Sequence, residues 1–213
     1  MCGSDRTIET FSLCDARRRM AMYRPYTAGS SPILSEGLSV WLIVLILCGI
    51  VFFYIASGGS DKTARAVRCG CYDRERIRQG QWWRMLTVGF THIQPWHIAM
   101  NLLALYNLRA LENFFGHAWF AGILLGSVVG GSLLEYAISR VRYSVGLSGG
   151  LYGLMFGYFL ILISYHSVSG LRSIAMTLVL NLFINFMPGI AWQAHVGGAV
   201  TGMILTEVFL LLH

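Results

Sequence analysis

Four polar side chains lie within or at the ends of long apolar segments, where polar groups are costly and often functional. They are His97 and Asn101 in one segment, Ser148 at the head of another, and His195 near the start of a third. His97 and Asn101 are spaced i, i+4, so on a helix both point from one face toward the same place. Each residue also has an ordinary interpretation, because serine bonds its own backbone, and histidine or asparagine joins neighbouring helices.

Glycine spacing favours a pairing of Ser148 with His195. Small residues recur at every fourth position after both of them: Gly149, Gly153 and Gly157 after Ser148, and Gly198 and Gly202 after His195. Such stripes let membrane helices approach closely. Close approach could place the serine within hydrogen-bond reach of a base, which is what activates a hydroxyl as a nucleophile. A third stripe has no polar residue beside it and predicts packing alone: Gly122, Gly126 and Gly130.

The composition is that of a membrane protein. Hydrophobic residues make up 55% of the 213 residues and charged residues only 12%, whereas soluble domains carry about a quarter. The formal net charge is +6, and the basic residues gather in the N-terminal tail and from Lys62 to Arg84. Basic flanks beside apolar spans predict contact with anionic lipid headgroups, not with nucleic acid. Cys69 and Cys71 form a lone C-x-C pair, so no metal or cofactor is expected.

The apolar segments predict an all-α membrane protein with six helices. A span needs roughly 20 apolar residues, and about 17 at least. Ser173 to Thr206 contains no charged residue, but Met187-Pro188-Gly189 divides it into two helices because proline stops a helix. The expected spans are Leu38–Ala56, Trp96–Leu108, Ala118–Leu134, Ser148–Tyr165, Ser173–Met187 and Gln193–Leu212. Residues 38–213 should form this transmembrane domain, after a basic and disordered tail at residues 1–37.

The segment Ser57–Arg84 is too rich in charge to cross a membrane. At its end, Trp82, Trp83 and Arg84 are interpreted as an interfacial anchor, since indole rings favour the headgroup level. Lys62–Arg78 either contacts lipid headgroups or forms a solvated loop. Positive charge occurs on both sides of the expected spans, so the positive-inside rule does not support an orientation with the N-terminus inside.

The residues from Gln81 to Leu212 resemble the rhomboid intramembrane proteases in the order and spacing of their motifs. These motifs are Trp83-Arg84, His92 followed by His97-x-x-x-Asn101, Glu112-x-x-x-Gly116, Gly146-Leu147-Ser148-Gly149 with Tyr152 one turn on, and Ala194-His195-x-x-Gly198-x-x-x-Gly202. The resemblance implies a rhomboid-like six-transmembrane-helix bundle, with a water-filled cavity that opens to the extracellular or luminal side. It also implies a serine endopeptidase that cleaves transmembrane helices of other membrane proteins.

The resemblance also assigns roles to individual residues. Ser148 would attack the scissile carbonyl, and His195 would act first as general base and then as general acid. No acidic residue occupies a third position, so the two are expected to act as a dyad. Tyr152 would pack against His195 and hold its ring. Gly146 and Gly149 belong to the motif around the serine and would support it.

The oxyanion of a tetrahedral intermediate needs hydrogen-bond donors placed where its charge develops. Asn101 and His97 fit this role, together with the backbone N–H of Ser148. The alternative for His97 is a structural histidine that lines the water cavity. His92 is expected to support the loop or a water network.

Because a helix hides its carbonyls in hydrogen bonds, substrates should carry helix-weakening Gly or Pro near the cut and small residues at it.

Other classes of hydrolase fit the sequence poorly. The pattern G-x-S-x-G also occurs in α/β-hydrolases, but no acidic residue lies between Ser148 and His195. The metalloprotease motif H-E-x-x-H is missing. Glu135 and Glu207 lie near the ends of expected spans, which argues against an aspartyl intramembrane protease. No repeat relates the two halves, which argues against a transporter. The alternative that stays open is a catalytically silent rhomboid-like protein, similar to the derlins, that binds client transmembrane segments.

Overall fold

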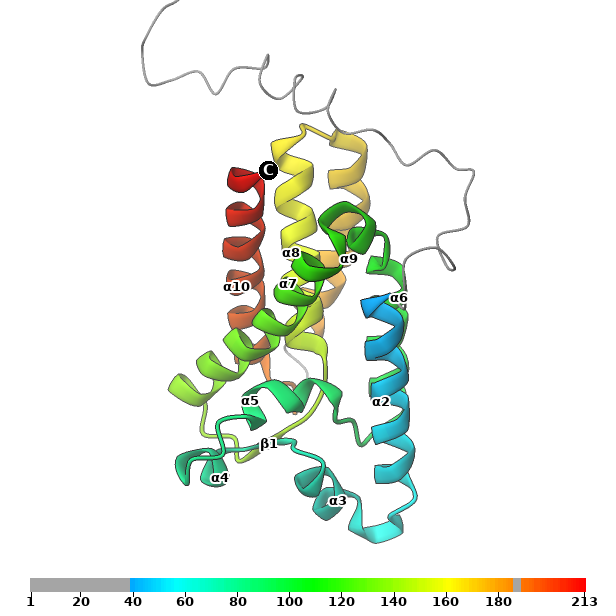
Figure 1. Cartoon of the computed structure of the whole chain (residues 1–213), viewed down its shortest axis with the longest axis vertical. Helices are drawn as coiled ribbons and strands as arrows, with labels where there is room; N and C mark the ends of the chain where they lie inside the picture. Colours follow the sequence, from blue (N-terminus) through cyan, green and yellow to red (C-terminus); the bar gives the residue numbers. More distant parts are fainter. Residues whose placement is uncertain (1–38, 186–188) are drawn as a thin grey trace, which may run out of the picture. The chain divides into compact units, whose positions relative to one another are not determined.

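The computed structural model describes residues 39–185 and 189–213, and these residues are mostly helical (Figure 1). The longer helices are α2 (Val40–Ala56), α6 (Pro95–Leu108), α7 (Ala110–Ile138), α8 (Ser148–Ser164), α9 (Val168–Ile184) and α10 (Trp192–Leu212). By length and apolar composition α7 and α10 could each cross a membrane, whereas α2, α8 and α9 are shorter apolar helices. The tail predicted at residues 1–37, and Met187 and Pro188 of the predicted break, lie outside the described residues.

The polar segment between α2 and α6 is folded into short elements. In chain order they are η1 (Gly59–Asp61), α3 (Lys62–Arg68), β1 (Tyr72–Asp73), α4 (Arg74–Arg78), α5 (Arg84–Thr87) and η2 (Val88–Phe90). Strand β1 pairs antiparallel with β2 (Tyr143–Ser144), and Tyr72 lies opposite Ser144. The pairing joins this segment to the chain just before α8.

Helix α7 is longer at both ends than the predicted span Ala118–Leu134. It runs from Ala110 to Ile138 with one break at Gly116, whose φ of 75° is non-helical. Glu112 lies in the first turn, where a carboxylate interacts favourably with the helix dipole. The predicted span therefore corresponds to the part of α7 that follows the break at Gly116, and the helical residues before the break were not predicted.

Helix α9 begins five residues before its predicted start at Ser173. The hydroxyl of Ser167 accepts a hydrogen bond from the N–H of Gly170 at 3.4 Å, which is the pattern of an N-terminal cap. Arg172, which marked the boundary in the sequence, is exposed on the surface of the helix. A single surface arginine is compatible with a helix, so the predicted boundary was wrong.

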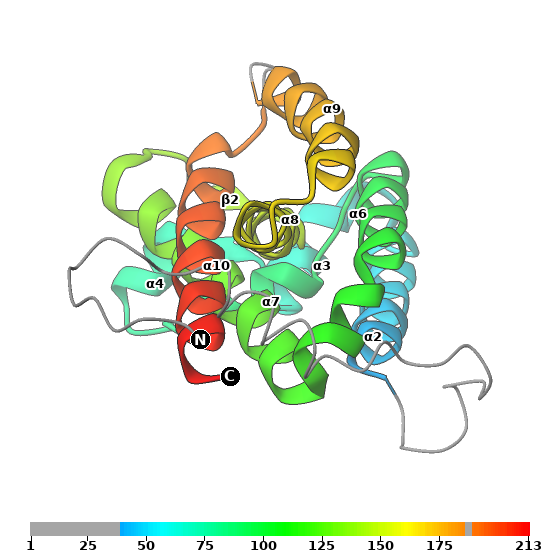
Figure 2. The ribbon, with the colours of Figure 1, turned by 90° about the horizontal axis from the view of Figure 1, so that it is seen from above.

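Helix α8 lies near the middle of the bundle, where Figure 2 shows it end-on with α6, α7, α9 and α10 around it. Its glycine stripe packs against that of α10, as predicted. A Cβ on Gly198 would collide with the backbone of Gly149, and one on Gly202 would collide with the backbone of Gly153. The two backbones therefore approach each other as closely as only glycine allows.

The third glycine stripe also packs, as expected, and its partner is α10. A Cβ on Gly130 would collide with the side chain of Thr201, and one on Gly126 would lie 2.9 Å from Leu205 Cδ1. Gly122 differs, because a Cβ there would meet no atom within 4 Å. Helices α7, α8 and α10 thus form the tightly packed part of the bundle.

The carboxylate of Glu112 ties α2 to α7. It is buried, with 3% exposed, and accepts from the N–H of Val40 at 2.7 Å and of Trp41 at 2.9 Å. Backbone N–H groups in the first turn of a helix lack intrahelical partners, and an anion there also favours the helix dipole. His117 Nδ1 lies 2.5 Å from the same carboxylate, so Glu112 holds three partners.

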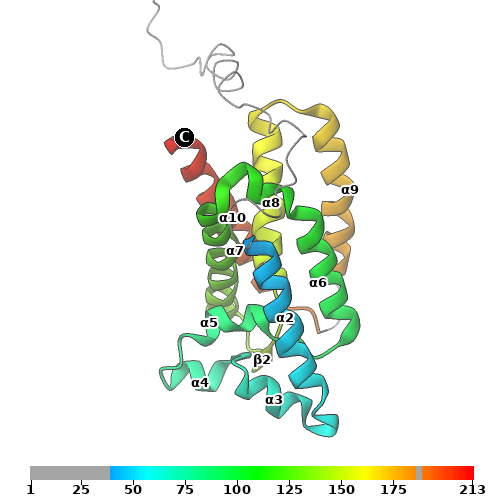
Figure 3. The ribbon, with the colours of Figure 1, turned by 45° about the vertical axis from the view of Figure 1, so that its right-hand side comes forward.

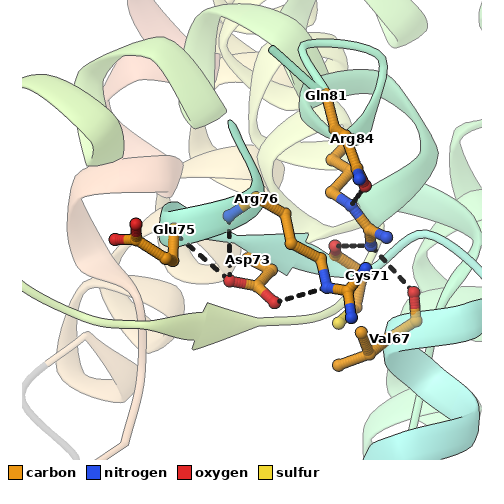
Figure 4. A network of polar contacts seen from close by, with 7 residues as sticks. All are labelled: Val67, Cys71, Asp73, Glu75, Arg76, Gln81 and Arg84. Atoms are coloured by element: carbon orange, nitrogen blue, oxygen red, sulfur yellow. Dashed lines mark hydrogen bonds and ion pairs between the residues drawn. The ribbon is translucent and has the colours of Figure 1, made fainter. Parts of the chain in front are cut away.

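The polar segment is organised around Arg84, as Figure 4 shows. Its guanidinium is buried and donates to the carbonyls of Val67 at 2.8 Å and Cys71 at 3.0 Å, and to Gln81 Oε1 at 2.8 Å. Burial also raises the pKa of the Cys71 thiol to about 12. The prediction of an interfacial anchor was therefore wrong for Arg84, which holds the loop together. Trp82 and Trp83 are about half exposed.

Candidate active site

Ser148 and His195 are hydrogen-bonded although 47 residues separate them in the chain. His195 Nε2 lies 2.8 Å from Ser148 Oγ, which is within the range of a normal hydrogen bond. Ser148 is the first residue of α8, and His195 lies in the first turn of α10. The contact follows from the packing of the two glycine stripes, because both residues precede the stripe on their helix.

The imidazole of His195 is held on two further sides. Tyr152, one turn after the serine on α8, stacks on it with ring centroids 4.2 Å apart and an angle of 10° between the planes. Asn185, which follows α9, forms a hydrogen bond through Oδ1 to His195 Nδ1. A carbonyl oxygen can only accept, so Nδ1 carries the proton and Nε2 presents its lone pair to Ser148. This is the tautomer that a general base needs.

Tyr152 and Asn185 also hold each other in place. Asn185 Nδ2 donates to the hydroxyl of Tyr152 at 3.1 Å, and that hydroxyl donates to the carbonyl of Asn181 at 2.9 Å. The end of α9 therefore connects to α8 and α10 through one side chain. Three helices position the imidazole.

Asn185 is a site residue that the sequence analysis missed. The expectation was a dyad with no third residue, and no carboxylate does occupy a third position near His195 among the described residues. An amide oxygen lies there instead. The available signal was the spacing of Asn181 and Asn185, i and i+4 in a segment without charged residues. The same spacing had singled out His97 and Asn101.

His97 and Asn101 lie together beside the turn that precedes Ser148. Gly146 in this turn has a φ of 122°, and a Cβ on it would lie 2.8 Å from His97 Nε2 and 3.5 Å from Asn101 Nδ2. Glycine is needed here for both the positive φ and the close approach. The two side chains thus lie against the same turn, as expected from their spacing on one helical face. Their oxyanion role stays a prediction.

His92 contacts both the Asn101 side chain and the turn before Ser148. Its Nε2 lies 2.9 Å from Asn101 Nδ2 and accepts from the N–H of Leu147 at 3.4 Å. The His92 and His97 rings meet edge to face, with centroids 5.3 Å apart. His92 is fully buried. These contacts agree with a residue that supports the loop.

A small cavity of about 20 Å³ adjoins Ser148. Among the residues that line it are Ser132, Glu135, Ser144, Gly146, Ser148 and Ala194. Glu135 is 1% exposed and lies inside α7. The sequence analysis placed it near the end of a span and gave it no role. The signal was its isolation, because it is the only acidic residue between Glu112 and Glu207.

Gly149 supports the site through packing, since a Cβ on it would lie 3.2 Å from the carbonyl oxygen of Ala194, next to His195.

A metal ion needs several ligands gathered in one place. In residues 39–185 and 189–213, no group of three or more His, Cys, Asp or Glu side chains could hold one.

Comparisons with known proteins agree on one family. A model of the rhomboid domain matches residues 79–211. Rhomboid protease GluP of Bacillus subtilis (strain 168) is 29% identical over 178 residues, which cover 80% of this chain and 35% of the relative. RHOMBOID-like protein 4 of Arabidopsis thaliana is 34% identical over 149 residues, which cover 67% of this chain and 38% of the relative.

A third relative is Rhomboid-related protein 1 of Caenorhabditis elegans, 29% identical over 196 residues that cover 79% of this chain and 54% of the relative. The chain thus spans between about a third and a half of the length of these relatives. The matched domain contains Ser148, His195, Tyr152 and Asn185 and makes up more than half of the chain. The chain belongs to the rhomboid family of membrane proteins.

Proposed function

We propose that this protein is an intramembrane serine endopeptidase that cleaves transmembrane helices of other membrane proteins with Ser148 and His195. The observation that carries the proposal is the 2.8 Å contact between Ser148 Oγ and His195 Nε2. It is supported by the tautomer that Asn185 imposes and by the stacked ring of Tyr152. A serine hydroxyl activated by a held imidazole is the arrangement that acyl transfer requires.

In this mechanism the Ser148 Oγ attacks the scissile carbonyl carbon, and its proton passes to His195 Nε2. The tetrahedral intermediate collapses with cleavage of the C–N bond, and the imidazolium returns the proton to the leaving amine. Water then attacks the acyl-serine ester, with His195 again as base, which releases a carboxylate and restores the hydroxyl. Asn101, His97 and the N–H of Ser148 stabilise the oxyanion in both steps.

The N-terminal position of Ser148 on α8 contributes to the same stabilisation. Helix α8 has 17 residues, and the backbone N–H groups of its first turn lack intrahelical partners. The helix dipole adds partial positive charge at this end. Negative charge that develops on the substrate next to Ser148 is therefore favoured by the backbone as well as by side chains.

In the proposed topology α2, α6, α7, α8, α9 and α10 each span the bilayer, and the site opens to the extracellular or luminal side. The apolar side chains exposed along α2, α9 and α10 support contact with lipid; they include Phe53, Phe183 and Ile204. Helices of 17 residues reach about 25 Å at 1.5 Å per residue, so such spans suit a locally thin bilayer.

The relatives support the enzymatic reading in part, since one is named a protease and others are named rhomboid-like. A catalytically silent protein that binds client transmembrane segments is the second candidate. The intact hydrogen bond between Ser148 and His195 favours the enzyme. A protein that only binds client segments does not need a histidine positioned to deprotonate a serine.

The test is labelling of the detergent-purified protein with a fluorophosphonate probe, which reacts with activated serines. We expect the wild type to be labelled and Ser148→Ala and His195→Ala to stay unlabelled. Cleavage of a transmembrane substrate should fall by at least about 10³-fold in both variants. Wild-type protein that is folded by its melting transition yet unlabelled would contradict the proposal and favour the silent binding protein.

A further inference from the structure

A larger cavity lies far from Ser148, between the end of α6, the start of α7 and the second half of α8. Its volume is about 250 Å³. Tyr158 and Ile161 line it from α8, and at 1.5 Å per residue they are about 15–20 Å along the helix from Ser148. The cavity is therefore separate from the site described above.

We propose that this cavity binds an acyl chain of an anionic phospholipid and that Arg109 binds the phosphate of the same molecule. The inference requires that the chain lies in a membrane, and it does not depend on the proposed catalytic activity.

The wall of the cavity is mostly apolar. Leu111 and Ile161 are buried, and Leu108 is partly buried. Asn107 and Ala110 also line the cavity and are exposed, so it is open at the turn where α6 ends and α7 begins. An empty apolar space would leave these lining atoms without dispersion contacts, and a lipid chain that enters from the bilayer supplies them.

The volume of the cavity favours a narrow occupant. Pockets that enclose drug-sized ligands have about 300–1,000 Å³, and this cavity, at about 250 Å³, is smaller. A single flexible acyl chain fits such a space better than a rigid ring system.

Arg109 supplies positive charge beside the opening. It lies in the turn between Leu108 and Ala110, both of which line the cavity. Its Nη1 donates to the carbonyl of Tyr106 at 2.6 Å, and the guanidinium lies 3.8 Å from the centroid of the Tyr106 ring. A guanidinium has five N–H donors, and no carboxylate among the described residues forms an ion pair with this one. The remaining donors suit a phosphate, which accepts through several oxygens.

The acidic residue nearest in the sequence, Glu112, does not neutralise this charge. Its carboxylate is buried and bonded to α2 and to His117. In the proposed topology this end of the bundle faces the cytoplasm, and the cytoplasmic leaflet carries anionic lipids. The charge at the opening is therefore complementary to the lipid that surrounds it.

Native mass spectrometry of the detergent-purified protein tests the site by titration with phosphatidylglycerol or with phosphatidylcholine of the same acyl chains. For the wild type we expect the first phosphatidylglycerol to bind with a Kd about tenfold lower, the range of one charge-assisted hydrogen bond. Arg109→Gln should bring the two Kd values together. Ala110→Phe places a ring at the opening and should raise both Kd values about tenfold.

Two matched variants control for charge and for size. Arg68→Gln removes an exposed cation from α3, at the Ser148 end of the bundle. Ala118→Phe adds a ring at an exposed position of α7 that does not line the cavity. Both should bind the two lipids as the wild type does, and the melting temperature in detergent shows whether each variant is folded.

Equal Kd values of the two lipids for the wild type would overturn the inference, and this comparison needs no variant to fold. Unchanged binding by Ala110→Phe would also overturn it, as expected if another part of the chain fills the cavity. Equal losses in Arg109→Gln and Arg68→Gln would indicate an effect of net charge and no site at Arg109. Fluorophosphonate labelling of the same samples reports on Ser148 alone, so failure of the lipid site and failure of the proposed function are distinguishable.

Discussion

The ring of His195 is fixed at both nitrogens and on one face. Nε2 faces Ser148, Nδ1 faces Asn185, and Tyr152 covers the ring at 4.2 Å. Asn185 is neutral, so it orients the imidazole without the full charge that a carboxylate would offer the imidazolium. We infer that its contribution is mainly to tautomer and orientation, as expected of a positioning residue.

Asn185→Ala should lower kcat by about 10- to 100-fold with little change in KM, because the wrong tautomer becomes accessible while substrate contacts stay. The matched control is Asn181→Ala, one turn earlier. The Asn181 side chain donates to Thr177 O in its own helix at 2.8 Å, and only its backbone carbonyl accepts from Tyr152. Equal kcat values for wild type and Asn185→Ala in steady-state cleavage would show that the contact has no such role.

Residue types and spacing were enough to bring Ser148, His195 and the His97–Asn101 pair to attention, since each is polar in an apolar segment. Asn185 and Glu135 have the same property and were missed. A lone polar residue on a membrane helix has many ordinary explanations. Asn185 is distinguished by its hydrogen bond to His195, and Glu135 by a buried carboxylate oxygen without a partner among the described residues. Both features depend on how helices that are distant in the sequence pack together.

At the scale of elements, the site depends on the close approach of α8 and α10. The contact surfaces are backbone against backbone, so there is no flexible side chain that could move aside for an added methyl group. Packing faults of this kind typically cost about 1–3 kcal/mol. A small change at this interface should therefore alter both stability and the Ser148–His195 distance.

Gly198→Ala should lower the melting temperature in detergent and abolish fluorophosphonate labelling, because its Cβ would collide with the backbone of Gly149. The control is Gly122→Ala on α7, where a Cβ meets no atom within 4 Å. That variant should be as stable as the wild type or more so, since alanine favours a helix by about 1 kcal/mol over glycine. Similar melting temperatures for both variants would contradict the packing argument.

Predicted helix positions were accurate where apolar runs end at clear breaks, as at Pro95 and near Trp192. They failed where a charged residue was taken as a boundary, as at Arg172, which lies on the surface of α9. The helical residues before Gly116 were not part of a predicted span, and Glu112 among them is buried with partners on α2. That compensation is tertiary, so it cannot be recognised from the local sequence.

At the scale of the molecule, the described unit has two different ends. Helix α8 begins with Ser148 at the end that carries α3, α4, α5 and the β1–β2 pair, and it joins α9 at the other end (Figure 3). In the proposed topology the first end faces the extracellular or luminal side. Charge alone did not support this orientation, since most of the basic residues of the polar segment lie at that same end.

Two cysteine substitutions test the orientation in a background with all five native cysteines replaced. Ser60→Cys lies in η1 at the Ser148 end, and Ser169→Cys lies in the first turn of α9 at the opposite end; both positions are exposed. A membrane-impermeant maleimide should label Ser60→Cys on intact cells and Ser169→Cys only after permeabilisation. The reverse pattern would invert the proposed topology.

The cap that Glu112 forms on α2 has a consequence for how the chain is made. The N–H of Val40 and its acceptor are 72 residues apart in the sequence, and a ribosome that adds about 5–20 residues per second needs roughly 4–14 s to bridge this interval. During that time α2 has emerged while its acceptor has not yet been synthesised. Until then the apolar side chains of α2 must stabilise it without this hydrogen bond, and the start of α7 later fixes it in place.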